Sequence, residues 1–212
     1  MTQSEERFLL IDDHVVVRSG LTFILSTYFA PCLIDEAEDG VSALEKLAEN
    51  KYTLAILDIK MPNTNTLQLM EVIRATYPKL NVVIFSMNSE SVYAKRFLKA
   101  GAQGFVNKDA PLNEVIKAIK QVLGGKKYIS ESMIEQLAEF GTDNKEQNLF
   151  NSLSPREFEI LSLILKGDGI SQIAHSLSLQ VSTVGTHKAR IFEKLKVNNL
   201  MELKELANTY TI

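Results

Sequence analysis

The sequence contains little cysteine, no tryptophan and no long apolar run. Cys32 is the single cysteine among 212 residues, which excludes an intramolecular disulfide and a zinc site built on several cysteines. No apolar run reaches the roughly 20 residues that a membrane-spanning helix needs. The first seven residues, MTQSEER, are polar and acidic, so we expect no signal peptide. These absences favour a protein of the reducing cytoplasm without a membrane partner.

A strong excess of one charge is also absent. The net charge is −3 at pH 7, and it divides into −4 over residues 1–149 and +1 over residues 150–212. This difference is too small to indicate a nucleic-acid partner by itself. Hydrophobic residues make up 45% of the chain and charged residues 23%, which is typical of globular proteins. The length allows one large domain or two modest ones.

Short apolar segments alternate with segments of helical periodicity over the first 124 residues. Strands are expected at residues 8–11, from 33, at 53–57, 81–86 and 103–107; helices are expected at 15–29, 41–50, 64–77, 91–100 and 112–123. This alternation predicts right-handed crossovers and a five-stranded parallel sheet of the flavodoxin-like α/β class. The spacing predicts that Val16, Leu21, Phe23 and Tyr28 of the first helix face the core, together with Val41 of the second.

Polar side chains follow the expected strands at the point where each strand ends. Asp12 and Asp13 follow the first strand, Asp58 the third, Ser86 ends the fourth and Lys108 follows the fifth. Because the carboxyl ends of parallel strands meet at one edge of a sheet, we expect these five residues to gather there. Any one of them alone would be read as an ordinary loop residue or helix cap. Their recurrence at four strand ends favours a site.

The residue types in this cluster indicate phosphoryl chemistry. Three adjacent carboxylates call for a divalent cation, and hard oxygen ligands suit Mg²⁺. Lys108 could bind an oxyanion, and Ser86 could donate a hydrogen bond to it. Asp58 could attack a phosphoryl donor, because carboxylates form aspartyl phosphates. Charge on the transferred oxygens would then be stabilised by the cation and the lysine.

Residues 7–124 resemble the receiver domain of bacterial two-component response regulators. The resemblance rests on Asp12-Asp13, on Asp58 followed by Met61-Pro62, on Ser86 and on Lys108. Within that family, Asp12-Asp13-His14, Arg18 and Gly20-Leu21 resemble the NarL/FixJ branch.

The resemblance implies a role for each site residue. Asp58 is the expected acceptor of a phosphoryl group from a sensor histidine kinase. Asp12, Asp13, Asp58 and the backbone carbonyl of Lys60 are the expected ligands of Mg²⁺ or Mn²⁺. Ser86 and Phe105 are the expected switch pair, with Phe105 changing rotamer as Ser86 moves. The residue type alone, however, predicts that Phe105 is an ordinary core aromatic. It likewise predicts that His14 is a polar partner of the acids rather than a metal ligand.

Three positions depart from the receiver pattern. Val15 replaces the proline that is common after Asp-Asp-His, and Thr66 stands where the loop usually has glycine. Met87 follows Ser86 where a small residue is usual. We interpret Met87 as a side chain that narrows access to Asp58 and slows phosphoryl exchange.

Strand patterns are absent after residue 149. A linker is expected at residues 125–149, with a helix at 130–140 and a polar tether at 141–148. Ser154-Pro155-Arg156-Glu157 is a strong helix start, with serine as N-cap and glutamate three residues later. Four short helices would share a core, which we assign to the following residues: Leu161, Leu165, Ile173, Ala174, Leu177, Val184, Ile191, Leu195 and Leu203. Residues 150–212 therefore form a second, smaller all-α domain of four helices.

Residues 170–177 and 181–196 have the form of a helix-turn-helix. The last part of the second helix contains four Lys or Arg residues, and this charge alone favours an ordinary solvated helix face. However, Leu153-Ser-Pro-Arg-Glu157 and Ser182-Thr183-Val184, with the residues around them, resemble a LuxR-type DNA-binding domain. The resemblance implies that residues 181–196 are the recognition helix, with DNA contacts expected from Ser182, Thr183, Thr186, Lys188 and Arg190. Gly185 replaces a lysine that is common there, and Ile170-Ser171 replaces a common Asn-Lys pair.

The sequence therefore predicts a transcription factor that binds promoter DNA and is controlled by phosphorylation of Asp58. On phosphorylation we expect homodimerisation or release of the recognition helix, and we expect no enzymatic turnover. One alternative is an orphan regulator whose receiver serves only for phosphorylation-independent dimerisation. Another is an aspartate-nucleophile phosphohydrolase, which Lys60 disfavours because those enzymes resemble Asp-x-Asp at this position.

Overall fold

The computed structural model describes residues 6–62, 64–87, 90–131, 149–177 and 179–210. The chain divides into two compact units, with the boundary between residues 137 and 138, and each unit is described by itself. The helix predicted for residues 130–140 and the tether predicted for residues 141–148 lie almost wholly outside the described residues. Among the helices that the structure describes, none is long and apolar enough to cross a membrane.

The first unit is built on a parallel five-stranded sheet, as the alternating pattern predicted. Its strands are β1 (Glu6–Ile11), β2 (Cys32–Ala37), β3 (Leu54–Leu57), β4 (Asn81–Ser86) and β5 (Gly104–Asn107). Their spatial order is β2-β1-β3-β4-β5, with every neighbouring pair parallel. The central strand β3 is buried at all four positions, which explains its continuous apolar sequence.

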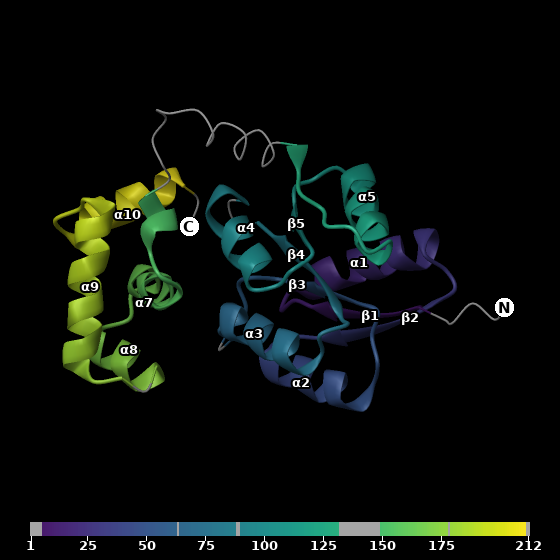
Figure 1. The fold of residues 1–212 in the computed structure, drawn as a ribbon, viewed down its shortest axis with the longest axis horizontal. Helices are drawn as coiled ribbons and strands as arrows, with labels where there is room; N and C mark the ends of the chain where they lie inside the picture. Colours follow the sequence, from purple (N-terminus) through teal and green to yellow (C-terminus); the bar gives the residue numbers. More distant parts are fainter. Residues whose placement is uncertain (1–5, 63, 88–89, 132–148, 178, 211–212) are drawn as a thin grey trace. The chain divides into compact units, whose positions relative to one another are not determined.

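Helices cover both faces of the sheet (Figure 1). Helices α1 (Val15–Tyr28) and α5 (Leu112–Leu123) lie on one face, and α2 (Gly40–Glu49), α3 (Thr66–Thr76) and α4 (Glu90–Lys99) lie on the other. On the α1/α5 side, the core contains Phe8, Leu10, Leu21, Leu25, Leu54, Ile56, Val83, Phe85, Val106, Val115, Ala118, Ile119 and Val122. Alternate residues of the strands face the other layer, so each strand contributes to two cores.

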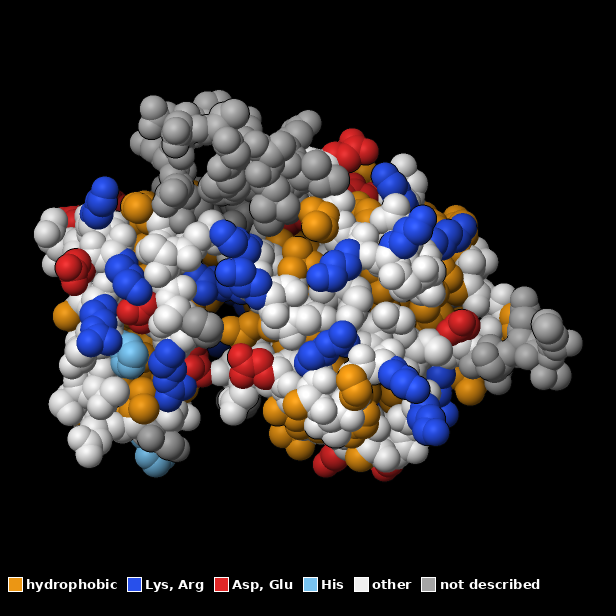
Figure 2. All heavy atoms as spheres, in the orientation of Figure 1, with side chains coloured by type: hydrophobic (Ala, Val, Ile, Leu, Met, Phe, Trp, Pro, Cys, Tyr) orange, Lys and Arg blue, Asp and Glu red, His pale blue; other side chains and the backbone are white. Residues whose placement is uncertain are grey.

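The predicted inward faces of the first two helices are partly wrong. Helix α1 buries Arg18, Leu21 and Leu25, whereas Val16 is 84% exposed and Phe23 is 71% exposed. Tyr28 and Val41 are also exposed, and Figure 2 shows apolar side chains gathered at the surface over α2. The apolar positions of α1 surround the helix, so periodicity could not select the face that packs on the sheet.

A short segment after α5 completes the first unit. The amide of Tyr128 donates to the carbonyl of Gln103 at 2.8 Å, and Tyr128 pairs with Gly104 as a parallel bridge beside β5. The Tyr128 ring is 3% exposed and belongs to the α1/α5 core. Its hydroxyl donates to Glu114 of α5 at 2.6 Å, and the Ser130 hydroxyl donates to Glu90 at 2.6 Å. The segment therefore packs along the outer edge of the sheet.

The second unit contains helices and no strand among its described residues. A short 3₁₀ turn, η1 (Leu149–Ser152), precedes α7 (Pro155–Lys166), α8 (Ile170–Ser176), α9 (Val181–Leu195) and α10 (Leu200–Thr209). The four predicted helices are confirmed. Their core buries seven of the predicted residues, while Leu165 and Leu177 are only half-buried. Phe150 of η1 is fully buried and stacks edge-on against Tyr210, with ring centroids 5.3 Å apart.

The predicted start of α7 is confirmed in detail. The Ser154 side chain accepts from the Glu157 amide at 3.2 Å, and the Glu157 carboxylate accepts from the Ser154 amide at 2.7 Å. This reciprocal capping box satisfies two backbone donors that a helix start leaves unpaired. Gly167 ends the helix with a φ of 98°, a left-handed conformation that favours glycine.

Candidate functional site

The loops after β1, β3 and β5 bring the three predicted acids and the predicted lysine together. Asp12 and Asp58 are each 3% exposed, and both lie at the carboxyl edge of the sheet because β1 and β3 are parallel neighbours. The Asp58 amide donates to the Ile11 carbonyl at 2.9 Å, which ties the two loops directly. Buried carboxylates in this position need compensation by charge and hydrogen bonds.

Lys108 supplies that compensation to both acids. Its ammonium lies 2.6 Å from Asp12 Oδ2 and 2.9 Å from Asp58 Oδ2. Burial alone would lower the pKa of Lys108, but the hydrogen bonds to Asp12 and Asp58 outweigh it, so this pKa lies above the ordinary value. The Lys108 amide also donates to the carbonyl of Ser86 at 3.1 Å. The lysine is therefore charged and fixed between the acid loops and the end of β4.

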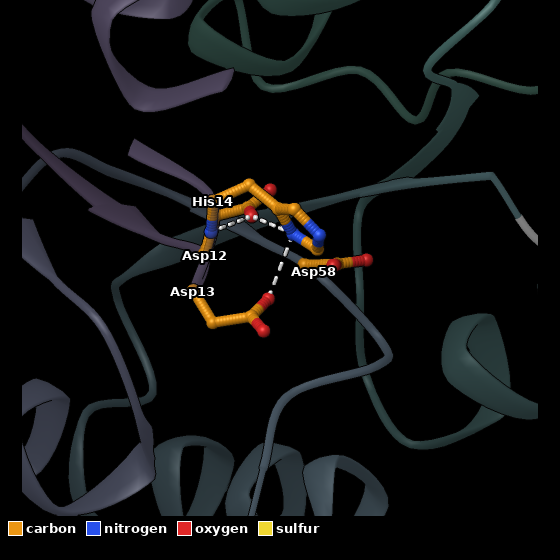
Figure 3. Close-up of side chains that lie close together, drawn as sticks. All are labelled: Asp12, Asp13, His14 and Asp58. Carbon is orange, nitrogen blue, oxygen red and sulfur yellow. Dashed lines mark hydrogen bonds and ion pairs between the residues drawn. The ribbon is translucent and has the colours of Figure 1, made fainter. Parts of the chain in front are cut away.

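Figure 3 shows Asp12, Asp13, His14 and Asp58 converging at this edge. Asp12 Oδ1 accepts from the His14 amide at 2.8 Å, and the His14 ring nitrogen Nδ1 lies 3.2 Å from the same oxygen. The same Nδ1 is 2.9 Å from Asp13 Oδ1, without the geometry of a hydrogen bond. Among the described residues, that buried Asp13 oxygen has no hydrogen-bond partner. Asp13 is thus the acid of this cluster with a buried oxygen still available to bind a ligand.

The donor set fits a hard divalent cation. One ligand atom from each of Asp12, Asp13, His14 and Asp58 can be chosen so that all four lie within 4.8 Å of one another. Carboxylate oxygens are the ligands that Mg²⁺ prefers, and Mg²⁺ commonly binds through one or two carboxylates plus water. The unsatisfied Asp13 oxygen is the feature that a cation would complete. Lys60, predicted to contribute its carbonyl, lies exposed in the same loop two residues after Asp58.

The predicted switch residues are both buried. Ser86, at the end of β4, is 1% exposed, and Phe105 in β5 is 1% exposed. Phe105 pairs in register with Ile84, so Phe105, Ile84 and Ser86 share one face of the sheet. In this structure Phe105 therefore serves as a core aromatic beside Ser86. Met87 is 54% exposed and directly follows the serine.

Thr66 has a role in this site that the sequence did not indicate. The residue is 4% exposed at the start of α3, and its hydroxyl donates to the Ile59 carbonyl at 2.7 Å. The Ile59 amide in turn donates to Asp58 Oδ1 at 2.7 Å. Thr66 thus holds the peptide segment that binds the Asp58 carboxylate. A threonine in place of the expected glycine was the only signal, and it did not reveal the partner.

The predicted helix-turn-helix is formed by α8, a turn and α9. On α9, Ser182, Thr186 and Arg190 are exposed, and Thr183 and Lys188 are half-exposed. The Lys188 ammonium lies 5.3 Å from the centroid of the Phe192 ring. Figure 2 shows several Lys and Arg side chains at the surface over α9. The five residues predicted to contact DNA are therefore accessible along one helix.

Lys194, at the end of the same helix, is held by the domain itself. Its ammonium lies 2.6 Å from Glu157 Oε2 and 3.2 Å from the carbonyl of Ser152. Burial alone would raise the pKa of Glu157, but hydrogen bonds from Lys194 and Ser154 more than offset it, so this pKa lies below the ordinary value. Lys194 therefore attaches α9 to the start of α7.

Comparison with family models matches both units. Residues 8–120 match the model described as "Response regulator receiver domain", and residues 151–207 match "Bacterial regulatory proteins, luxR family".

Similar proteins cover nearly the whole chain. The response regulator GacA of Pseudomonas protegens is 34% identical over 201 residues, which covers 95% of this chain and 94% of that protein. The oxygen regulatory protein NreC of Staphylococcus carnosus is 34% identical over 208 residues, covering 95% and 96%. A solved structure of RcsB from Salmonella enterica serovar Typhimurium, bound to promoter rprA with the phosphomimetic BeF3-, has a TM-score of 0.80 at 22% identity and covers 97% of this chain and 100% of that chain.

Proposed function

Because this chain belongs to the DNA-binding response regulators of two-component systems, with a receiver domain and a LuxR-type helix-turn-helix domain, we propose that Asp58 is its phosphoacceptor. The observation that carries this proposal is the position of Lys108, whose ammonium bridges Asp58 and Asp12 at 2.9 and 2.6 Å. An ammonium placed there can bind a phosphoryl oxygen as soon as the group is attached to Asp58. The proposed donor is a sensor histidine kinase.

In the proposed transfer, a carboxylate oxygen of Asp58 attacks the phosphorus of a phosphohistidine. A phosphorus–oxygen bond forms, the phosphorus–nitrogen bond breaks, and the histidine ring takes up a proton as it leaves. Lys108 changes partner from the Asp58 carboxylate to an oxygen of the phosphoryl group. Ser86, which ends the neighbouring strand, donates a hydrogen bond to another oxygen. Ile59 and Thr66 keep the Asp58 loop in place during this exchange.

Asp12, Asp13, Asp58 and the Lys60 carbonyl would hold Mg²⁺ or Mn²⁺ at this edge. When bound, such a cation neutralises charge on the transferred oxygens. The unsatisfied buried oxygen of Asp13 supports this assignment.

Phosphorylation adds a charge of about −1.5 to −2 and three acceptor oxygens beside Lys108 and Ser86. We propose that Ser86 moves toward the phosphoryl group, that Phe105 changes rotamer, and that β4, α4 and the receiver surface shift with them. The result is a two-state equilibrium whose populations the local charge shifts. The readout is homodimerisation, which places two copies of α9 on promoter half-sites.

DNA recognition is assigned to α9. Ser182, Thr183, Thr186, Lys188 and Arg190 lie accessible along this helix, and an α-helix fits the major groove of B-DNA. Lys and Arg would contact phosphates and base edges, while the hydroxyls fix the register. Lys194 is excluded from this set because Glu157 and Ser152 bind it.

The phosphoacceptor is tested by intact-mass measurement. The wild-type protein and Asp58→Asn are incubated with a small phosphodonor, with and without Mg²⁺. The expected result is one phosphoryl adduct on the wild type, dependent on Mg²⁺ and absent from Asp58→Asn. An adduct of equal yield on Asp58→Asn would contradict the assignment. Steady release of inorganic phosphate from a small phosphoester would instead favour the phosphohydrolase alternative.

The dimer is tested by footprinting on genomic fragments selected by binding. Two recognition helices of a dimer are expected to protect half-sites about one helical turn apart, roughly 34–36 Å. Protection of a single isolated half-site by the phosphorylated protein would contradict the dimer. Equal DNA affinity for wild type and Asp58→Asn, with and without the phosphodonor, would favour a receiver that serves only for dimerisation.

A further inference from the structure

Arg18 is a buried arginine that the chemistry proposed above does not use. It lies in the first turns of α1, and its side chain is 11% exposed. A buried guanidinium is stable only when its donors are paired. Arg18 has two such partners on different elements: Nε donates to Glu36 Oε2 of β2 at 2.7 Å, and Nη1 donates to the carbonyl oxygen of Asp12 at 2.6 Å.

The second contact falls on the peptide group that joins the two acids of the first loop. The Asp12 carbonyl oxygen belongs to the rigid plane between Asp12 and Asp13, so fixing this oxygen fixes the orientation of the plane. The Asp12 amide is held separately, by the Ala37 carbonyl at 3.1 Å. Rotation of the Asp12–Asp13 peptide would carry the Asp13 carboxylate away from Asp58. Arg18 opposes that rotation.

Glu36 determines where the guanidinium lies. Glu36 pairs in register with Leu10 of β1, two positions before Asp12. Its carboxylate is therefore held next to the strand that leads into the acid loop. Arginine can serve both partners because its donors form a planar fork, whereas a lysine ammonium at this site has no such fixed geometry. The arrangement connects α1, β2 and the acid loop through one side chain.

We propose that Arg18 is a positioning residue for the acid cluster, which orients the Asp12–Asp13 peptide so that both carboxylates face a divalent cation. This inference rests on the cation site proposed above. It predicts that loss of Arg18 weakens cation binding more than the loss of another arginine that forms an ion pair with β2.

Arg7 provides that matched comparison. Its Nε donates to Asp35 Oδ2 of β2 at 2.7 Å, one residue before Glu36, but Arg7 lies near the start of β1, away from the acid loop. If Arg18 only stabilised the fold, Arg7→Met and Arg18→Met would both lower the free energy of unfolding, and both would leave cation affinity unchanged.

The test measures Mn²⁺ binding to the full-length protein by electron paramagnetic resonance of the free ion. Wild type and Arg7→Met are expected to bind with the same Kd. Arg18→Met is expected to raise the Kd about tenfold or more, and Arg18→Lys, which retains the charge but not the fork, to lie between. In the cation-free protein, amide hydrogen exchange at residues 12–14 is expected to be faster in Arg18→Met and unchanged in Arg7→Met.

Three outcomes separate this inference from the proposed function. Wild-type affinity in Arg18→Met overturns the inference and leaves the cation site standing. If the wild type binds no Mn²⁺, both the cation site and the inference fall. If Arg18→Met does not fold, Glu36→Gln replaces it: this variant retains the packing but weakens the anchor of Arg18. A two- to threefold rise in its Kd for Mn²⁺ supports the inference, and an unchanged Kd overturns it.

Discussion

Asp13 has a buried carboxylate oxygen without a hydrogen bond among the described residues, close to the carboxylates of Asp12 and Asp58. Like charges at short range repel one another, whereas the cation site proposed above needs all three acids. At the scale of single residues, the acid cluster is therefore a place where function and stability conflict.

We expect Asp13→Asn to raise the free energy of unfolding of the cation-free protein by about 1 kcal/mol, because it removes one of three crowded charges. The same variant is expected to lose the stabilisation that Mg²⁺ gives the wild type through preferential binding to the folded state. Urea unfolding in EDTA and in Mg²⁺ measures both effects. Asp109→Asn, an exposed acid next to Lys108, should change neither; a less stable Asp13→Asn would contradict the argument.

The sequence identified the titratable residues of this site but not the residues that position them. Asp12, Asp58 and Lys108 could be predicted because each follows a strand, and parallel strands end at one edge. The contacts of Arg18 with Glu36 and of Thr66 with Ile59 join residues whose distance depends on helix packing and loop conformation. No periodicity or spacing carries that information, so these roles required the structure.

At the scale of elements, the proposed recognition helix α9 contains a glycine that nothing in the packing requires. A Cβ added at Gly185 would meet no atom within 4 Å, and its φ is not in the left-handed region. Gly167 also has open space around it, but its φ of 98° ends α7 in a conformation that other residues rarely adopt. Both glycines therefore have room for a Cβ atom, and they differ only in backbone conformation.

Gly185→Ala is expected to raise the free energy of unfolding of the DNA-binding domain by about 1 kcal/mol, because alanine favours the helix interior. Gly167→Ala is expected to lower it by about 1 kcal/mol through strain at positive φ. Amide hydrogen exchange of α9 and α7 in the full-length protein measures both changes. The same sign for both variants would contradict this account of the two helices.

The ion pair that attaches α9 to α7 gives the second domain a sensitivity to acid. The pKa of Glu157 is lowered in the folded protein, so its carboxylate contributes stability that is present above the ordinary value of 4.5 and is lost as pH falls through the folded pKa. The free energy of opening of α7 and α9, obtained from hydrogen-exchange protection factors, should therefore decrease on acidification below about pH 4.5.

Glu157→Gln is expected to be less stable than the wild type at pH 7 and to show a weaker dependence on pH below that range. Glu193→Gln, an exposed neighbour on α9, should behave as the wild type. An equally steep acid dependence in Glu157→Gln would assign the sensitivity to another group.

The positions of the elements could be predicted, but not all of their inward faces. Strand β4 and helix α5 begin and end where the sequence predicted. In α1, however, apolar residues occupy every side, and burial of Leu21 and Leu25 rather than Val16 and Phe23 is decided by contact with the sheet. An amphipathic pattern selects a face only where the opposite face is polar.

At the scale of the molecule, the alternating pattern and the loss of strands after residue 149 were sufficient to predict two folds in one chain. The unpredicted part is the segment around Tyr128, which belongs to the receiver core although it follows the last predicted helix. The amide and the ring of Tyr128 contact residues that are distant in sequence. The local sequence of this segment, which contains turn-forming and polar residues, therefore did not predict its packing against the sheet.

A receiver fragment of residues 1–131 is expected to unfold at a higher urea concentration than a fragment of residues 1–124. The shorter fragment loses the buried Tyr128 ring, and truncation of a large buried aromatic typically costs about 3–5 kcal/mol. Tyr128→Phe in the longer fragment should cost only about 1 kcal/mol, because it removes the hydrogen bond to Glu114 alone. Equal midpoints for the two fragments would contradict the contribution of this segment.

The Tyr128 segment also has a consequence for self-association. β5 lies at one end of the sheet, where an uncovered strand presents unpaired amides and carbonyls to any other extended chain. By bonding to Gln103 and pairing with Gly104, the segment occupies part of that edge before a neighbouring molecule can. Proteolytic cleavage just after α5 would therefore leave a less stable domain whose edge strand β5 is free to pair with other chains. Concentrated solutions of this domain would be prone to form fibres.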